Sequence, residues 1–390
     1  MSTSPINIRQ LTQRAFSALQ AGDNRRAQPE FEKIIATGRA DTMHWMGLAM
    51  ACSGLGDTER ALSALDKSLE LGPRNLRAVL MKADLLAQQG QSRVAFQHYK
   101  YGLQLAENAA DLPGDISQAL LRAQKACAER EREYRDFLLQ RLRGEGIVPA
   151  DAPVRFQQSL ALIFGDKEIY YQQPRRFYYP GLPQIQFYER EQFDWAASIE
   201  AATDRIRAEL LPVMQDASRF SPYVRSGDSK IGRNDQGLAD NDDWSALYLW
   251  DHSRLVPENA ALFPHTLEAL EAAPMPEIAL QAPMALFSKL APGTRIPPHN
   301  GLLNTRLICH LPLVVPPDCG ALRVGNEERP WVEGELLIFD DSIEHEAWNN
   351  SDRERVILLF EIWRPEISAE ERKLLTRMLI AVKEYADRPA

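Results

Sequence analysis

A 34-residue period in the first part of the chain is the feature that most constrains its fold. Four sets of residues recur at this spacing, namely Gly22, Gly56 and Gly90; Ala27, Ala61 and Ala95; Ala15, Ala49 and Ala83; and Phe31, Leu65 and Tyr99. Small residues let two paired helices approach closely, glycine suits the turn between them, and larger apolar residues fill the gap to the next pair. Coincident registers at several positions indicate a stack of helical hairpins rather than an unrelated helical bundle.

This pattern is similar to the tetratricopeptide repeat and predicts three repeats, at about 8–40, 41–74 and 75–108, within an α-helical solenoid of residues 1–110. The concave face of such a stack typically holds an extended peptide or a partner helix. We therefore expect a peptide or protein partner, and a substrate presented by the repeats would be one such partner. Residues 111–150 are expected to form a capping helix, over 115–142, and a linker rich in Gly and Pro.

Length and composition predict a second domain over residues 151–390, because 390 residues exceed what one hydrophobic core normally supports. The net charge of −9 argues against a general nucleic-acid binder or an anionic-membrane binder. No apolar run approaches the length of a membrane span, so none is expected. The four cysteines show neither metal-binding spacing nor a dense disulfide pattern, which favours buried free thiols and a cytoplasmic protein.

Short apolar runs separated by Pro and Gly turns predict β strands at 307–315, 321–324, 335–340 and 356–363. Two histidines, His299 and His345, stand at the ends of strand-like segments, and Arg355 opens the last and most apolar run. Such an arrangement is typical of a β barrel that places ligands at its strand ends.

Two histidines and a downstream arginine on successive strands are consistent with a non-haem Fe(II) site that binds a dicarboxylate co-substrate. Neutral imidazole suits divalent iron, and the arginine fork pairs with both oxygens of a carboxylate. The usual site adds a carboxylate two residues after the first histidine, where this chain has Gly301. From the spacing alone, isolated histidines in strands are more often satisfied core or surface residues than metal ligands.

The same stretch resembles the catalytic domain of the aspartyl/asparaginyl β-hydroxylase family. The matching residues are Pro292-Gly293-Thr294, Pro298-His299-x-Gly301, Asn304, His310-Leu311-x-Leu313, Arg323-Val324-Gly325-Asn326-Glu327, Trp331-x-Glu333-Gly334, Phe339-Asp340-Asp341-Ser342, Glu344-His345-Glu346-x-Trp348-Asn349, Arg355 and Trp363-x-Pro365. The resemblance implies a double-stranded β-helix, a jelly-roll or cupin-like fold, with flanking helices. It also implies an iron ion held by two histidines and no protein carboxylate, which accounts for Gly301.

On this resemblance, His299 and His345 correspond to the iron ligands, and Arg355 to the partner of the distal carboxylate of 2-oxoglutarate. Ser288 corresponds to a serine that binds the same carboxylate. His310 corresponds to a histidine near the carboxylate that chelates the iron.

The chain departs from the family pattern at Ile308, where we expect an arginine, and Arg306 on the same strand face is the candidate to compensate. Asp340 and Asp341 could be read as a third metal ligand, but the family pattern indicates that they are structural turn residues. Trp244 is a candidate substrate contact, with core packing as the alternative. The polar segment 226–243 before it is a candidate substrate lid, with a loop of no function as the alternative.

The activity implied by the resemblance is that of a dioxygenase that uses Fe(II), 2-oxoglutarate and O2. It would hydroxylate an unactivated carbon, most often the β-carbon of an Asp or Asn residue in a peptide or protein. One alternative is a hydroxylase of a free amino acid, a lipid or a peptide natural product. Another is a non-catalytic tetratricopeptide scaffold, against which stand the intact His299, His345 and Arg355.

Overall fold

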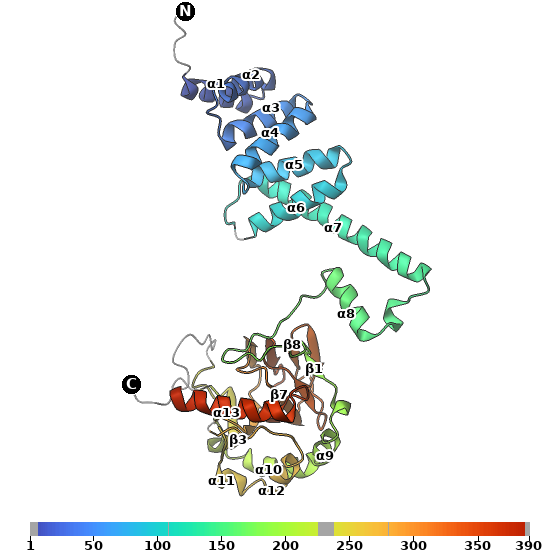
Figure 1. Ribbon diagram of the computed structural model, residues 1–390, viewed down its shortest axis with the longest axis vertical. Helices are drawn as coiled ribbons and strands as arrows, with labels where there is room; N and C mark the ends of the chain where they lie inside the picture. The colour runs from blue at the N-terminus through green and yellow to red at the C-terminus, as the bar shows by residue number, and fades with distance from the viewer. Residues whose placement is uncertain (1–6, 108, 225–237, 280, 387–390) are drawn as a thin grey trace, which may run out of the picture. The chain divides into compact units, whose positions relative to one another are not determined.

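The computed structural model describes residues 7–107, 109–224, 238–279 and 281–386. The chain divides into two compact units, Met1–Phe164 and Gly165–Ala390, which are drawn together in Figure 1 and described separately below. The division falls later than the expected start of the second domain at residue 151. Helix α8 (Val154–Ile163) groups with the first unit, where the Arg135 guanidinium of the preceding long helix lies over the Phe164 ring at 4.5 Å.

The first unit contains three helical hairpins, as the 34-residue period predicts. Their helices are α1 (Ile8–Gln20) and α2 (Asn24–Ala36), α3 (Thr42–Gly54) and α4 (Thr58–Leu71), and α5 (Leu76–Gln88) and α6 (Ser92–Ala106). Figure 1 shows the pairs stacked one after another. Most of these helices begin after an Asn or Asp whose side chain accepts a hydrogen bond from the first turn, as Asp23 does from the Arg26 amide.

The recurring residues occupy the places expected of them. The recurring alanines are buried where helices touch, and Phe31 and Leu65 fill the spaces between hairpins. The recurring glycines of the turns, Gly22, Gly56 and Gly90, have φ values of 73°, 78° and 76°, a conformation that favours glycine.

A long helix, α7 (Gly114–Gly144), follows the repeats and packs against α5 and α6 through buried Ile116, Ala123 and Cys127. This agrees with the predicted capping helix. The unit ends with the short 3-10 helix η1 (Pro149–Asp151) and α8.

The second unit is built on eight strands, β5 to β12, which are divided between two antiparallel sheets. They are β5 (Ala285–Leu290), β6 (Arg295–His299), β7 (Arg306–Val314), β8 (Ala321–Val324), β9 (Glu327–Pro330), β10 (Leu337–Phe339), β11 (His345–Trp348) and β12 (Arg355–Trp363). One sheet has the order β10-β7-β12-β5 and the other β6-β11-β8-β9. This is the double-stranded β-helix topology, a jelly roll, that the sequence led us to expect.

Further strands extend the larger sheet on both sides. They are β1 (Phe187–Tyr188) beside β10, then β3 (Trp244–Asp251) beside β5, followed by β2 (Ser221–Pro222) and β4 (Arg254–Leu255), which both pair with β3. Alternation along β7 separates two faces: Leu307, Cys309 and Leu311 join one hydrophobic cluster, and Ile308 joins another. The second cluster lies between the two sheets and surrounds the candidate site.

Helices cover the outer face of the larger sheet. The elements outside the strands are η2 (Arg190–Gln192), α9 (Ala196–Ala201), α10 (Thr203–Val213), η3 (Ala217–Arg219), α11 (Pro257–Ala260), α12 (Pro264–Leu270) and α13 (Ala369–Ala386). Ile199 and Ile206 pack with Leu358 of β12 on this face. Helix α13, drawn in red in Figure 1, begins with a capping box, in which Ser368 and Glu371 exchange hydrogen bonds.

Two expectations about the chain as a whole can be compared with the described residues. All four cysteines are buried and free. Every helix in the described ranges is too short or too polar to cross a lipid bilayer.

Candidate metal and co-substrate site

The two histidines singled out by the sequence lie side by side. His299 is the last residue of β6, His345 is the first residue of β11, and the two are paired across the smaller sheet. Their ring centroids are 4.1 Å apart. Residues 46 positions apart are thus brought together because β6 and β11 are antiparallel neighbours.

Hydrogen bonds to the backbone orient both rings. Nδ1 of His299 lies 2.8 Å from the Pro297 carbonyl oxygen, and Nδ1 of His345 lies 3.0 Å from that of Ile343. A carbonyl oxygen can only accept, so Nδ1 carries the proton in each ring and the Nε2 lone pair of the neutral form is left for a metal. Burial lowers the pKa of His299 to about 3 and that of His345 to about 4, so both rings are neutral at neutral pH.

Gly301 lies against a carboxylate that comes from another loop. A Cβ atom at Gly301 would fall on the side chain of Asp341, so no carboxylate side chain could be accommodated at position 301. Asp341 is buried, burial raises its pKa, and it lies 3.4 Å from Arg306. Within the described parts of the chain, no three His, Cys, Asp or Glu residues are grouped to hold a metal ion.

Arg355 is a buried cation at the start of β12. Its side chain is only 1% exposed, and its Nε and Nη1 atoms have no hydrogen-bond partner among the described residues. Burial lowers its pKa to about 10, so it is still charged at neutral pH. Its guanidinium lies 4.7 Å from the centre of the Trp331 ring. An uncompensated buried charge is costly, and an anion beside Arg355 would offset that cost.

His310, Ser288 and Trp244 line the same interior. The His310 ring lies 4.9 Å from that of Phe339, and its Nδ1 is buried without a partner in the described structure. The Ser288 oxygen accepts a hydrogen bond of 3.2 Å from the Trp244 indole, which leaves the hydroxyl proton available to another acceptor. Trp244 is also stacked on Tyr223, and its ring centroid lies 6.3 Å from that of His299. Residues 225–237, most of the candidate lid, lie outside the described residues.

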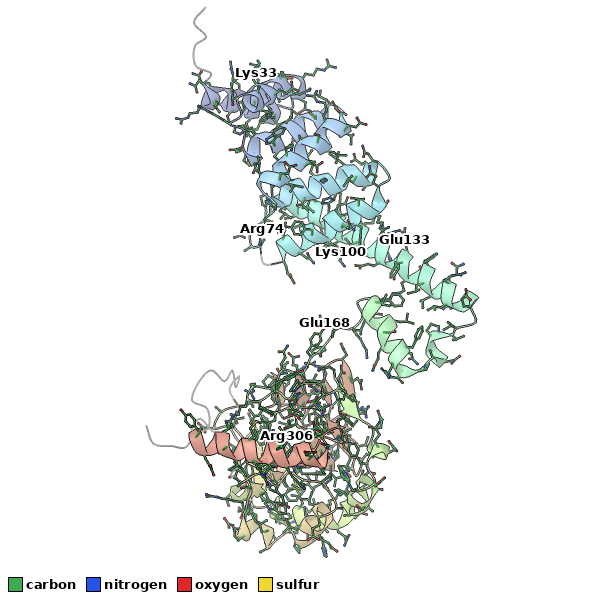
Figure 2. All side chains as sticks on the ribbon, in the orientation of Figure 1. Lys33, Arg74, Lys100, Glu133, Glu168 and Arg306 are labelled. Carbon is green, nitrogen blue, oxygen red and sulfur yellow. The ribbon has the colours of Figure 1, made fainter. Side chains whose placement is uncertain are left out.

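Arg306, labelled in Figure 2, is already paired with acidic side chains. It forms ion pairs with Glu361 of the neighbouring strand and with Asp341. Ile308, where the family arginine was expected, faces Glu361 across the β7–β12 pair and belongs to the inner hydrophobic cluster. That Arg306 replaces the family arginine missing at position 308 stays a prediction. The two acidic neighbours of Arg306 offset the positive charge with which it would bind a carboxylate.

A buried polar network, which the sequence patterns do not reveal, joins the segment before β1 to the loop after His299 and the loop before His345. The Gln172 amide donates to Asp340 at 2.7 Å and accepts from Asn304 at 2.9 Å. Arg364 pairs with the same carboxylate at 2.7 Å, and both side chains of that ion pair are fully buried. Asp340 also accepts hydrogen bonds from the Ser342 amide and hydroxyl, as expected of a structural turn residue.

The two family models that match the chain agree with the two-unit architecture. The family model for aspartyl/asparaginyl β-hydroxylase matches residues 200–365, and that for the tetratricopeptide repeat matches residues 53–110. The TPR2B domain of yeast Sti1 superposes with a TM-score of 0.28 and 18% identity, covering 30% of this chain and 96% of that domain.

Three curated relatives resemble the chain over different lengths. Human aspartyl/asparaginyl β-hydroxylase is 35% identical over 179 residues, 46% of this chain and 22% of that protein. The mouse protein of the same name is 28% identical over 345 residues, 88% of this chain and 42% of that protein. Ornithine lipid ester-linked acyl 2-hydroxylase of Rhizobium tropici is 32% identical over 225 residues, 56% of this chain and 73% of that protein.

The fold and the site define a class of protein, in which a helical repeat unit is followed by a double-stranded β-helix that carries two adjacent histidines. The family model and the relative from Rhizobium tropici place the chain within that class: it belongs to the aspartyl/asparaginyl β-hydroxylase family. The chain spans less than half the length of the human and mouse relatives.

Proposed function

We propose that the chain is a dioxygenase dependent on Fe(II) and 2-oxoglutarate that hydroxylates an unactivated carbon. His299 and His345 would hold the iron through their Nε2 atoms, and Arg355 and Ser288 would bind the distal carboxylate of 2-oxoglutarate. When bound, iron and 2-oxoglutarate supply the oxidation, in which O2 is consumed, 2-oxoglutarate yields succinate and CO2, and a C–H bond becomes C–OH.

One observation carries this proposal: two neutral, backbone-anchored histidines share the interior of the barrel with a buried arginine whose Nε and Nη1 atoms have no hydrogen-bond partner among the described residues. A metal suits the first group because a neutral imidazole with a fixed tautomer is a ready ligand. A carboxylate suits the second because it accepts two hydrogen bonds from one guanidinium. A non-catalytic scaffold would gain nothing from leaving Arg355 uncompensated.

As substrate we propose an Asp or Asn residue of a peptide or protein, hydroxylated at its β-carbon. The family name supports this choice, and a repeat unit that takes a peptide or protein partner is consistent with it. Presentation of the substrate by the repeats and a cytoplasmic location are parts of the same proposal.

A second candidate substrate is a lipid acyl chain. It is supported by the relative from Rhizobium tropici, which is named for 2-hydroxylation of an ornithine lipid and of which this chain covers 73%. Parallel assays with Asp- and Asn-containing peptides and with ornithine lipid would distinguish the two substrates.

The proposed function is tested by succinate formation from 2-oxoglutarate under air with Fe(II), ascorbate and each of these candidate substrates. We expect the wild type to form succinate, and His345→Ala and Arg355→Ala to lose at least about 90% of that rate, because they remove a metal ligand and the cation for the distal carboxylate. His252→Ala, at an exposed turn, is the matched control and should keep the wild-type rate. Equal rates in all four proteins would refute the assignment of these residues.

A further inference from the structure

Trp331 is a buried tryptophan whose polar atom has no partner. It follows β9, is 6% exposed, and packs in the hydrophobic cluster between the two sheets. Its indole Nε1 has no hydrogen-bond partner among the described residues. Buried tryptophans usually find an acceptor for this N–H, and leaving it unpaired is costly. The acceptor for this N–H therefore lies outside the described residues, and a bound ligand would supply one.

The other unpaired nitrogen atoms of the barrel interior belong largely to residues around Trp331. Eight side-chain N or O atoms are buried without a partner in the described parts of the chain, and four of them come from His310, Trp331 and Arg355. The Trp331 ring lies 4.7 Å from the Arg355 guanidinium carbon and 5.6 Å, centroid to centroid, from the His310 ring. The buried nitrogen atoms of these three neighbouring side chains thus have no hydrogen-bond partner among the described residues. A carboxylate beside them would supply acceptors.

Trp331 has a second feature that bears on Arg355. The face of an indole ring carries negative electrostatic potential, so it stabilises a cation placed over it, most strongly when water is excluded. Arg355 is nearly inaccessible to solvent and has this ring as its aromatic neighbour. The ring therefore holds the guanidinium in place before any anion arrives, and its planar support limits how the arginine fork can rotate.

We propose that Trp331 is a binding residue for the distal carboxylate of 2-oxoglutarate, donating its indole N–H to that carboxylate while its ring supports the guanidinium of Arg355. This inference rests on the proposed function. The Trp331 indole adds a neutral hydrogen-bond donor to the charged donor Arg355. The site thereby selects a carboxylate at the far end of the co-substrate by several directed hydrogen bonds.

Calorimetric titration of the Fe(II)-loaded protein with 2-oxoglutarate under argon tests this proposal without turnover. Trp331→Phe keeps an aromatic face and removes the N–H, and should raise the Kd for 2-oxoglutarate about tenfold to a hundredfold, as expected for a lost hydrogen bond to a charged group. Trp331→Leu also removes the ring and should raise the Kd further. Trp195→Phe, which loses an indole N–H on the outer face of the larger sheet, is the matched control and should match the wild type.

A second ligand separates a binding role from a structural one. In 2-oxopentanoate a methyl group replaces the distal carboxylate while the chelating end is unchanged. We expect Trp331→Phe to bind 2-oxopentanoate as well as the wild type does. If Trp331→Phe binds 2-oxoglutarate as tightly as Trp195→Phe does, or if both ligands weaken equally, the assignment of Trp331 is wrong. If the wild type itself does not bind 2-oxoglutarate, the proposed function fails first, and this inference with it.

The wild-type protein offers a second measurement in case Trp331→Phe does not fold. Among its seven tryptophans, Trp331 should show an indole N–H resonance that moves downfield with 2-oxoglutarate and stays in place with 2-oxopentanoate, whereas that of Trp195, on the outer face of the larger sheet, should respond to neither ligand. The other resonances can be assigned by Trp→Phe substitution at their own positions, which leaves that of Trp331 by elimination. A Trp331 resonance that responds to neither ligand, or equally to both, would overturn the proposal.

Discussion

At the scale of single residues, the candidate site is held by buried polar contacts whose loss should be expensive. Asp340 and Arg364 form an ion pair of 2.7 Å with both side chains fully buried. Burial raises the pKa of Asp340, while Arg364 opposes that shift by favouring the charged carboxylate. Because Asp340 also anchors Gln172 and the turn that leads to His345, this pair connects the stability of the barrel to the position of a proposed metal ligand.

Arg364→Met should therefore destabilise the second unit by about 3–5 kcal/mol, because it leaves a buried carboxylate without its cation. Unfolding in urea followed by tryptophan fluorescence measures this, since six of the seven tryptophans lie in that unit. Arg353→Met, which removes an exposed arginine 3.9 Å from Asp352, itself exposed, is the control and should cost less than about 1 kcal/mol. Similar losses for the two variants would mean that the buried network contributes little.

At the scale of elements, the helical repeats depend on close approach between helices. Gly47 of α3 lies against the Phe31 ring of α2, and a Cβ atom there would overlap the ring. We expect Gly47→Ala to destabilise the first unit by about 1–3 kcal/mol, since the ring has no free space into which to move. Circular dichroism during urea unfolding measures the helical signal.

Gly144→Ala is the matched control for this substitution. Gly144 ends α7 in open space, so the same methyl group meets nothing within 4 Å, and the free energy of unfolding should rise or fall by no more than about 1 kcal/mol. A Gly47→Ala protein as stable as Gly144→Ala would show that α2 and α3 can move apart without a loss in the free energy of unfolding.

Sequence patterns predicted the elements with strong periodicity and missed contacts between distant segments. The three hairpins follow from registers that repeat every 34 residues, and β7, β8, β10 and β12 follow from apolar runs bounded by turns. The pairing of Arg306 with Glu361 depends on two strands lying side by side, and no local pattern marks it. The helical stretch before β2 is divided at Ala202 into α9 and α10, a break that the apolar spacing does not reveal.

The candidate site shows the same division between local and distant information. Its histidines, Ser288 and Arg355 came from motifs in one stretch of sequence, and the structure places them in one interior. The contribution of Gln172 was not predicted, because it lies more than 100 residues before its partners Asn304 and Asp340. Trp331 was recognised as part of a motif, but only its unpaired indole N–H indicates a role.

At the scale of the whole molecule, the chain joins a helical repeat unit to a unit with two sheets around a buried polar site. The first has the small residues and stacked hairpins of a tetratricopeptide repeat. The second encloses two neutral imidazoles and an uncompensated arginine between its sheets. The proposed function requires the second unit to take up iron and 2-oxoglutarate together, whatever partner the first unit binds.

The most direct measurement of this central claim is anaerobic titration of Fe(II) into the wild type and His299→Ala, with and without 2-oxoglutarate, followed by the visible charge-transfer absorption of an iron–oxoacid complex. We predict one iron per wild-type chain, an absorption band that appears only when 2-oxoglutarate is added, and loss of both in His299→Ala. A wild type that takes up no iron, or a band of equal strength in His299→Ala, would contradict the assignment of the two histidines as the metal site.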